Sequence, residues 1–539
     1  MSETDDVDVL VVGGGPAGTI AAAKAARAGL RVLLLEAGAH PRAHVGESLL
    51  PGIIPILADI GALPAIEAAG FGRKTGSTLW HWGRTPRWDL WFADSDAYDA
   101  AWLVERARFD AILFEHARSV GARCLERASV RAVAWAGDRA VGAHWTDADG
   151  SARFTAAKLV VDASGQSALV GRHFGLREPI AGLRHQAMWA HFEGARRLPP
   201  PRSAQALFIA TARQWWWMFP LSEHRTSVGV VQLDAELRQG PPRPDFDAEL
   251  AACDELTAVL GPDAVRVTPV RNERDWSYRQ REVAGPGWLL VGDAAGFIDP
   301  VLSTGVMLAM HSGWHAAMTA AAIVSGDDRA ADRYQAHYRG MFDDLLRMVR
   351  FYYQQNLDRD DYFWESKRIL VDEANALRPQ KAFVILTSGL VQNLALDAVA
   401  ARQRGRVEAD ATDLEGADPD HLGFVCLHLR RGTAAAEPGD GPDRGTSMYV
   451  LVEPADPAAP TLQKTRNFHV NAIAPRHGND PISVPELAGP LRTLAGWIAA
   501  LDTEPADSLA AFWRRARGAL ATRLAGGLEG FELVRAFGE

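Results

Sequence analysis

The first forty residues carry a strand, a glycine-rich turn and a helix, and this pattern constrains the fold more than any other feature of the chain. A buried-strand run at residues 7–12 is followed by Gly13-x-Gly15-x-x-Gly18 and by a helix of small residues at 19–28. Such glycines let the backbone approach a pyrophosphate, whose charge is met by the free amides at the helix N-terminus. Glu36 closes the next strand at the distance where a carboxylate takes ribose hydroxyls. The sequence therefore predicts a dinucleotide site, and the acidic ribose partner disfavours a 2′-phosphate.

Three downstream segments decide which dinucleotide is bound. They are the strand at residues 288–291 with Gly292-Asp293, the strand end at 159–165 containing Asp162, and Val104-x-Arg106-x-x-Phe109-Asp110. Each alone is also typical of an ordinary strand end or helix start, but together they resemble the FAD-contacting segments of aromatic-hydroxylase-type flavoproteins. The resemblance implies FAD rather than NAD, held by Gly13, Gly15, Ala17, Gly18, Glu36, Arg106, Asp162, Gly292 and Asp293.

The segment at residues 214–220, Gln-Trp-Trp-Trp-Met-Phe-Pro, narrows the family. Alone, three consecutive tryptophans are typical of aromatic packing in a sheet core. Here they lie between two halves of a flavin-binding pattern and resemble the Trp-x-Trp-x-Ile-Pro signature of flavin-dependent halogenases. The match is at Trp215, Trp217 and Pro220, with Phe219 in place of the isoleucine. The resemblance implies that these residues form the wall of a tunnel leading from the flavin.

Two more segments resemble halogenase sequences. His44 to Pro51, which includes Ser48, resembles a stretch that the family places against the flavin. Phe297-x-x-Pro300-x-x-Ser303-Thr304-Gly305 resembles the segment that follows Gly-Asp, and implies a chloride held by the amides of Thr304 and Gly305, with Gly305 also against the flavin. Convergent N–H donors in a dry pocket suffice for a halide. The alternative is a simple helix N-cap at Ser303 or Thr304, and both interpretations can hold together.

The halogenase resemblance requires an early lysine on a strand that leads away from the flavin. Lys74, ahead of the strand at residues 77–82, occupies that place, and Arg73 is the weaker candidate. From position alone, a lysine near a loop is usually solvated. As the family's essential lysine, Lys74 would hydrogen-bond hypochlorous acid or carry chlorine as a chloramine, and burial would lower its pKa and suit it to this role.

One departure from the family pattern bears on the substrate. Tryptophan halogenases place a glutamate directly before Ser-Thr-Gly, whereas this chain has Leu302. A phenol or pyrrole is already electron-rich and needs less activation by a carboxylate than an indole. Leu302 therefore indicates the phenol and pyrrole branch. The sequence leaves open whether the substrate is free or tethered to a carrier protein. An acidic carrier would find a docking surface in arginines 402, 404, 406, 430 and 431, which are otherwise solvated.

The resemblance, which covers residues 7 to about 390, implies a two-component enzyme of natural-product biosynthesis. A separate flavin reductase would supply reduced FAD, because the chain has a single dinucleotide motif. Oxygen would then give a C4a-hydroperoxide, chloride or bromide would be oxidised, and hypohalous acid would pass the Trp217 wall to Lys74 and the arene. The alternatives are an aromatic monooxygenase, whose substrate meets the flavin directly, and a non-catalytic FAD-binding protein.

The motifs also predict the domain organisation. We expect an α/β (α+β) fold in which residues 1–326 form a Rossmann-like FAD-binding domain of the GR2 type, interleaved with a mostly antiparallel β-sheet substrate domain at about 73–103 and 177–284. A long helix is expected after residue 327, a short strand at 448–452 and helices at 485–524. Residues 327–539 would thus be a mainly helical extension that covers the substrate.

Composition sets the outer limits. A net charge of −10 without a basic tract argues against nucleic acid. The acidic N-terminus lacks an apolar signal region, the apolar stretch at 382–396 is too short and too polar to span a bilayer, and cytoplasmic location is the default. Three cysteines without paired spacing suit a reduced compartment, and the 16 histidines form no visible ligand cluster, so no metal is expected.

Overall fold

The computed structural model describes two compact units. The described residues are 6–95, 97–211, 214–233, 245–327, 329–354, 357–370 and 378–390, with four strands between 425 and 536. The first unit takes in Met1–Ser95, Asp99–Ile369 and Pro379–Asn393, and the second takes in Asp96–Tyr98, Leu370–Arg378 and Leu394–Glu539.

The N-terminal motif folds into the centre of a mainly parallel sheet. Strand β1 (Val7–Val12) pairs in parallel with β2 (Val32–Leu35) and with β10 (Ala152–Asp162). Strands β1 and β2 are almost continuous apolar runs because both faces of a parallel sheet are covered by other layers, whereas the first half of β10 is largely exposed and pairs with the antiparallel β9. The eight-stranded sheet is completed by β7 (Arg123–Leu125), β8 (Ser129–Ala136), β9 (Arg139–Thr146), β17 (Ala284–Gly285) and β18 (Trp288–Leu290).

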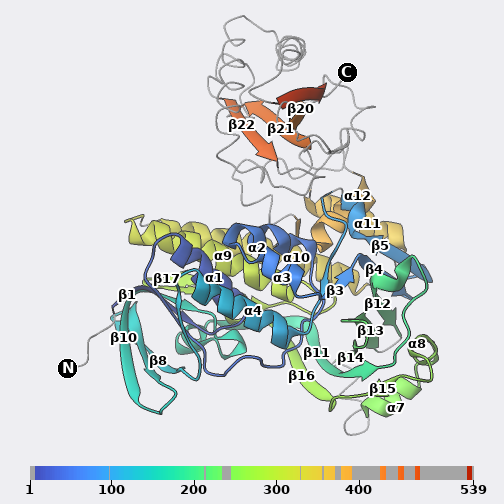
Figure 1. The fold of residues 1–539 in the computed structure, drawn as a ribbon, viewed down its shortest axis with the longest axis horizontal. Helices are drawn as coiled ribbons and strands as arrows, with labels where there is room; N and C mark the ends of the chain where they lie inside the picture. Colours follow the sequence, from blue (N-terminus) through green and yellow to red (C-terminus); the bar gives the residue numbers. More distant parts are fainter. Residues whose placement is uncertain are drawn as a thin grey trace, which may run out of the picture. The chain divides into compact units, whose positions relative to one another are not determined.

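Three long helices pack beside this sheet (Figure 1). They are α1 (Pro16–Arg27), α4 (Arg106–Ser119) and α9 (Gly305–Val324). Helices α1 and α9 cross closely because Gly313 has no side chain: a Cβ there would lie 2.2 Å from the Ala17 carbonyl oxygen. The N-terminal turn of α1 is thereby held against the middle of α9. Shorter elements in this layer are η1 (Pro51–Ile53), α2 (Ile54–Ile60), α3 (Leu63–Ala68), η3 (Gly165–Ser167), α5 (Leu169–His173) and η5 (Gly292–Ala294).

A second sheet is assembled from the interleaved segments. Its path runs β19-β16-β11-β14-β13-β12-β4-β5, and the neighbours along it are antiparallel except β12 and β4. The strands are β4 (Gly76–Trp80), β5 (Arg87–Trp91), β11 (Arg177–Glu193), β12 (Gln205–Ala210), β13 (Gln214–Pro220), β14 (Thr226–Leu233), β15 (Val265–Arg266), β16 (Arg271–Gln280) and β19 (Gly296–Phe297). The expected α/β fold class with an interleaved, mostly antiparallel sheet is confirmed.

Small elements complete this part of the first unit. Strands β3 (Gly72–Lys74) and β6 (Ala101–Leu103) form a separate two-stranded ladder in which Lys74 pairs with Ala101. Helices α7 (Phe246–Ala251) and α8 (Asp254–Leu260) supply buried side chains to the core on one face of the second sheet. The short helices η2 (Phe92–Ser95) and η4 (Arg202–Ala204) connect strands.

The first unit continues beyond residue 326, where the sequence placed a domain boundary. The expected long helix is α10 (Ala330–Tyr352), and α11 (Arg359–Leu370) and α12 (Pro379–Thr387) follow it. Helix α10 belongs to this unit because its aromatic stripe, including Tyr334 and Phe342, is buried against it. None of the described helices is both long and apolar enough to span a bilayer.

The described part of the second unit is a four-stranded antiparallel sheet in the order β22-β21-β20-β23. Its strands are β20 (Val425–Arg431), β21 (Ser447–Pro454), β22 (Phe468–Ile473) and β23 (Phe531–Ala536). Strand β21 contains the strand expected at 448–452. The helices expected at 485–524 lie outside the described residues, so the mainly helical character of this region stays a prediction.

Candidate active site

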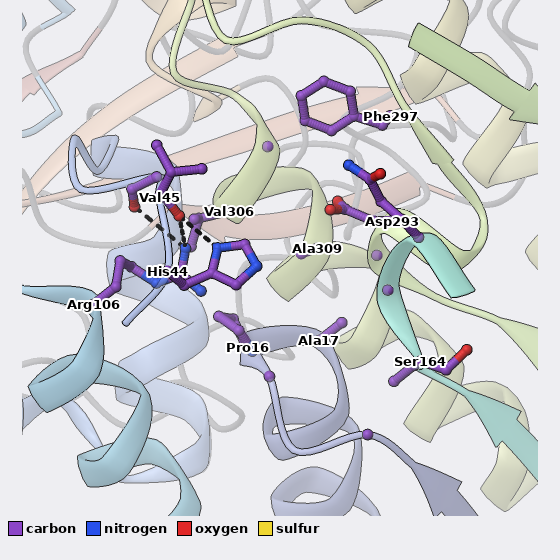
Figure 2. A pocket seen from close by; sticks show the side chains of 18 of the residues that line it. Pro16, Ala17, His44, Val45, Arg106, Ser164, Asp293, Phe297, Val306 and Ala309 are labelled. Carbon is purple, nitrogen blue, oxygen red and sulfur yellow. Dashed lines mark hydrogen bonds between the residues drawn. The ribbon is translucent and has the colours of Figure 1, made fainter. Parts of the chain in front are cut away.

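A cavity of about 690 Å³ lies between the two sheets of the first unit. The N-terminus of α1, the segment 44–48 and the start of α9 all contribute to its lining. Figure 2 shows His44 and Arg106 on one side of it and Asp293 and Phe297 across from them. Of the residues expected to bind FAD, those that line the cavity are Gly13, Gly15, Ala17, Glu36, Ser48, Arg106, Gly292, Asp293 and Gly305.

The glycines of the N-terminal turn are required by close backbone approach. Gly13 has φ +108°, and a Cβ there would lie 2.3 Å from the Ala163 carbonyl oxygen. Gly18 does not line the cavity; a Cβ at this position would lie 1.9 Å from the Gly13 carbonyl oxygen. Gly18 therefore keeps α1 packed on the turn, whereas Gly13 and Gly15 leave the cavity open to a ligand.

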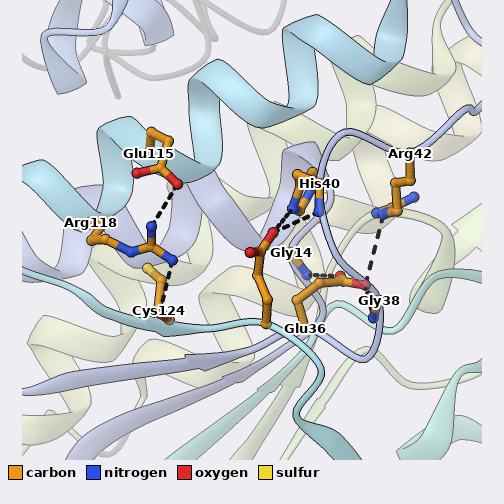
Figure 3. A network of polar contacts seen from close by, with 9 residues as sticks. Gly14, Glu36, Gly38, His40, Arg42, Glu115, Arg118 and Cys124 are labelled. Atoms are coloured by element: carbon orange, nitrogen blue, oxygen red, sulfur yellow. Dashed lines mark hydrogen bonds and ion pairs between the residues drawn. The ribbon is translucent and has the colours of Figure 1, made fainter. Parts of the chain in front are cut away.

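Glu36 is held where β2 ends, at the edge of the cavity (Figure 3). Its carboxylate accepts hydrogen bonds from the Gly14 amide at 2.7 Å and the Gly38 amide at 2.8 Å. The Nε of Arg42 lies 3.8 Å from the carboxylate, and this buried nitrogen has no hydrogen-bond partner in the part of the chain that the structure describes. Arg42 also lines the cavity, close to Gly15. A guanidinium with one unsatisfied nitrogen beside a glycine turn fits the diphosphate of FAD.

Arg106 is fixed at the first residue of α4. Its guanidinium binds both carboxylate oxygens of Asp110, at 2.8 and 2.9 Å, and donates to the Val45 carbonyl at 2.6 Å. The bidentate pair holds the segment around Val45 against the cavity.

Burial raises the pKa of Asp293 to about 6, although the nearby Arg106 charge opposes this rise.

Asp162 does not reach the cavity, although the sequence counted it among the FAD ligands. Its buried carboxylate accepts hydrogen bonds from the backbone amides of Ser164, at 3.0 Å, and Val170, at 2.8 Å. A buried carboxylate must be satisfied, and here the adjoining loop supplies the donors. Asp162 thus shapes a loop whose residues 163–167 line the cavity.

The three tryptophans of β13 are divided between two faces of the second sheet, as strand geometry requires. Trp215, Trp217 and Phe219 line the cavity, whereas Trp216 and Met218 are buried in the core on the opposite face. The Trp217 ring lies over Gly229, where a Cβ would be 2.2 Å from the ring. Its indole N–H donates to Ser227 Oγ at 3.1 Å. Pro220 ends the strand and does not line the cavity.

The loop before α9, residues 299–304, is held by side chains rather than by a helix cap. Thr304 is the N-cap residue but makes no side-chain cap hydrogen bond. Ser303 adopts a left-handed φ of +57°, and its Oγ donates to Ser48 Oγ at 3.1 Å. Thr304 is therefore at the N-cap position that the alternative interpretation named, but its hydroxyl does not cap the helix. Gly305 lines the main cavity, and Thr304 lies on a small adjoining pocket.

Lys74 is 1% exposed and sits behind the lining of the cavity. Its Nζ donates to Ser48 Oγ at 2.8 Å and to the Leu49 carbonyl at 3.3 Å, and lies 5.0 Å from the centre of the Phe92 ring. Among the described residues no carboxylate forms an ion pair with it. Burial lowers the pKa of Lys74 to about 7. Ser48, which lines the cavity, therefore connects Lys74 to it.

Sequence reasoning missed two residues of the cavity wall, Arg42 and Asp299, and two residues that contact Asp299 without lining the cavity, His185 and Tyr353. Arg42 was identifiable as a basic residue shortly after Glu36, and Asp299 lies inside the motif that was recognised at 297–305. His185 and Tyr353 carried no local signal, since a histidine in a strand and a tyrosine at a helix end are common in any core. Within the described residues, no group of three or more His, Cys, Asp or Glu side chains is placed to hold a metal.

Comparison with known proteins agrees with this site. The tryptophan halogenase family model matches residues 93–384, and the FAD dependent oxidoreductase model matches residues 8–172. Tryptophan 2-halogenase of Chondromyces crocatus is 34% identical over 76% of this chain and 80% of its own length. The 1H-pyrrole-2-carbonyl-[peptidyl-carrier protein] chlorinase of Pseudomonas fluorescens is 31% identical over 65% and 84%.

Solved structures extend the likeness. The myxobacterial chondrochloren halogenase CndH, at 32% identity, superposes with a TM-score of 0.61 over 75% of this chain and 96% of its own. The halogenase CmlS, at 22% identity, shares the fold, with a TM-score of 0.61 over 97% of this chain and 93% of its own. The dinucleotide cavity, the tryptophan wall and these relatives together set aside the monooxygenase and non-catalytic alternatives. The chain belongs to the flavin-dependent halogenase family and is an FAD-dependent enzyme.

Proposed function

We propose that this halogenase passes an oxidised halogen, with chloride as the halide, through Lys74 to a phenol or pyrrole. The observation that carries the proposal is the buried amine itself: Lys74 has a pKa of about 7 and is hydrogen-bonded to Ser48, which lines the cavity. An uncharged amine is a nucleophile, whereas an ordinary surface lysine is protonated at neutral pH.

FAD would be held by the glycine turn at Gly13 and Gly15, by Arg42 and by the Gly292-Asp293 turn. Bound in reduced form, it supplies with oxygen the oxidant that converts halide to hypohalous acid. The backbone amides of Thr304 and Gly305, at the N-terminus of a 20-residue helix, provide the partial positive charge that a halide requires. Because the described residues offer one dinucleotide cavity, a separate reductase would deliver the reduced flavin.

The amine of Lys74 can use hypochlorous acid in two ways. It can donate a hydrogen bond to the acid and orient it, or it can form an N–Cl bond while the O–Cl bond breaks and the released hydroxide takes an Nζ proton to leave as water. In the second case the arene attacks chlorine, the N–Cl electron pair returns to nitrogen, and the arene proton is lost to that nitrogen. Both routes end with a chlorinated ring and a regenerated lysine.

The tryptophan wall would confine the oxidised halogen. Trp215, Trp217 and Phe219 line the cavity, and the Trp217 and Phe219 rings stack with their centroids 5.9 Å apart. Apolar rings offer hypohalous acid few hydrogen-bond partners, so they favour its passage towards polar groups such as Ser48. The wall would also keep the organic substrate away from the flavin.

A phenolic or pyrrolic substrate is supported by Leu302. This side chain is buried and apolar at the place where tryptophan halogenases carry a glutamate. The two relatives named above are, by their names, specific for tryptophan and for a carrier-bound pyrrole, so the proposal rests on the chemistry at Leu302. Of the arginines expected to dock a carrier protein, Arg430 and Arg431 are on β20, and arginines 402, 404 and 406 lie outside the described residues. Docking of a carrier on these arginines stays a prediction.

Product mass in the presence and absence of halide tests the proposal. Purified protein, FAD, a flavin reductase and NADH would be incubated with a phenol, a pyrrole and tryptophan, each free and, where possible, carrier-loaded. We expect chloride-dependent chlorination of the phenol or pyrrole. Hydroxylated product that is independent of halide would contradict the proposal, as would tryptophan being the best substrate.

A further inference from the structure

We propose that Tyr353 is a positioning residue that fixes the tryptophan wall relative to the loop before the halide site. The inference rests on the proposed function, because it concerns the same cavity. It states that a residue outside the sequence motifs holds two parts of the cavity wall in place. Tyr353 directly follows α10, far in the sequence from both features.

The Tyr353 hydroxyl connects two residues of the cavity wall. It accepts a hydrogen bond from the indole N–H of Trp215 at 3.1 Å and donates one to Asp299 Oδ1 at 2.9 Å. Trp215 and Asp299 both line the cavity. One hydroxyl group therefore joins the wall strand β13 to the loop 299–304.

Asp299 organises that loop. Its Oδ1 also accepts from the Val301 amide at 2.9 Å, and its Oδ2 lies 2.8 Å from Nδ1 of the buried His185 on β11. The His185 ring meets the Tyr353 ring edge to face, with centroids 5.0 Å apart. A buried carboxylate with this many donors can occupy only a narrow range of positions, and the backbone leading to Thr304 is fixed with it.

The end of α10 is itself anchored by a second indole. Trp82 donates its indole N–H to the Tyr352 carbonyl at 2.9 Å, and the Trp82 and Trp215 rings are 6.0 Å apart. Trp82 is fully buried, so this anchor does not depend on solvent. Tyr353 is thus presented by a rigid helix end, and its hydroxyl sets the spacing between Trp215 and Asp299.

Loss of the hydroxyl would leave the Trp215 indole N–H and one position on the Asp299 carboxylate without this partner. We expect the ring and the loop to relax independently, so that halide binds in a less favourable position and oxidised halogen escapes more often. FAD affinity should be unchanged, because the hydrogen bonds described for Tyr353 go to Trp215, Asp299 and His185 rather than to the glycine turn, Arg42 or the Gly292-Asp293 turn.

The test compares Tyr353→Phe with Tyr334→Phe. Tyr334 is on the same helix, and its buried hydroxyl makes one hydrogen bond, to the Leu290 carbonyl at 2.6 Å, away from the wall. For Tyr353→Phe we expect halogenated product per reduced FAD consumed to fall about tenfold, the size of losing one hydrogen bond to a charged group. The apparent KM for chloride should rise, and a hypohalite trap should collect the difference. Tyr334→Phe should match wild type.

Trp215→Phe removes the same hydrogen bond by deleting its donor, the indole N–H. This variant provides the test if Tyr353→Phe folds poorly. In the double variant, a shared network predicts a loss no greater than that of the more damaging single change, whereas independent roles predict additive losses. Additive losses would overturn the inference. So would a Tyr353→Phe enzyme that makes as much halogenated product per reduced FAD consumed as Tyr334→Phe. A wild-type enzyme that halogenates nothing would instead overturn the proposed function.

Discussion

Replacing Lys74 with methionine tests the catalytic amine and its burial together. Methionine keeps a similar apolar stem but removes Nζ and its hydrogen bonds to Ser48 and Leu49. We expect halogenation to fall by more than about a hundredfold, the lower end of what a positioned acid–base side chain contributes. FAD binding and the reaction of the reduced flavin with oxygen should persist, since the glycine turn, Arg42 and Asp293 are unchanged.

The same substitution should stabilise the fold. Burial lowers the pKa of Lys74 from 10.5 to about 7, which costs the folded state about 5 kcal/mol while the unfolded chain carries a charged lysine. Losing two hydrogen bonds offsets part of this gain, so the variant should be about 3 kcal/mol more stable at pH 7.

The free energy of unfolding should depend on pH through the protonation of Lys74. Between pH 7 and 10.5 the unfolded chain holds the proton and the folded chain does not, so wild-type stability contributed by this group rises with pH. The variant lacks this rise, and its advantage should be greatest below about pH 7 and shrink as the pH increases.

Chemical denaturation at several pH values and product analysis with added reductase measure both effects. Arg73→Met is the matched control: its side chain is 60% exposed and paired with Asp99 at 2.6 Å. Its stability should change by less than about 0.5 kcal/mol, and its activity should persist. Near-normal halogenation by a folded Lys74→Met enzyme would refute the catalytic role of Lys74. If the free energy of unfolding changes equally with pH in wild type and variant, the lowered pKa of the buried amine is refuted.

Three further predictions address the cofactor supply, the substrate and the wall. Purified protein with NADH, FAD, oxygen and chloride should be inert until a flavin reductase is added, and rapid NADH oxidation by the chain alone would contradict this. Leu302→Glu should raise activity on tryptophan relative to a phenol or pyrrole, as measured by competition between substrates; an unchanged ratio would remove Leu302 as the determinant. Trp217→Ala and Trp216→Ala should each cost about 3 to 5 kcal/mol of stability, but folded Trp217→Ala should release free hypohalite while folded Trp216→Ala should not; equal release would show that the wall is only packing.

The fold was predictable from local patterns because its chemistry depends on local backbone geometry. The Gly13 to Gly18 turn, the end of β2 at Glu36 and the Gly292-Asp293 turn each lie within one strand–turn unit. Sequence spacing joined the glycine turn to Glu36, the resemblance to flavoproteins added Gly292-Asp293, and residues of all three line one cavity. Lys74 was found by resemblance alone, since nothing in its neighbourhood predicts that Ser48, 26 residues away, receives its hydrogen bond.

The remaining features depend on contacts between distant segments. Tyr353 meets Trp215 across 138 residues and Asp299 across 54, and no periodic pattern encodes such pairs. Asp162 differs in another way: its motif was recognised, but its carboxylate accepts hydrogen bonds from backbone amides and does not line the cavity. A motif gives the position of a side chain along a strand, whereas its partner depends on the whole fold.

The glycine beneath Trp217 also bears on how the sheet finds its pairing. Three identical side chains in a row cannot distinguish one alignment from the next, and a slip by one residue would exchange the two faces of β13. In the observed alignment Trp217 is opposite Gly229, which has Val228 and Val230 on either side. Trp216 lies opposite Val230 and Trp215 opposite Val231, whereas a Cβ at Gly229 would lie 2.2 Å from the Trp217 ring, so only the position opposite Trp217 requires a glycine. Gly229 thus acts as an alignment key for β13 and β14, and a side chain there would be expected to yield misaligned protein rather than a merely weakened native state.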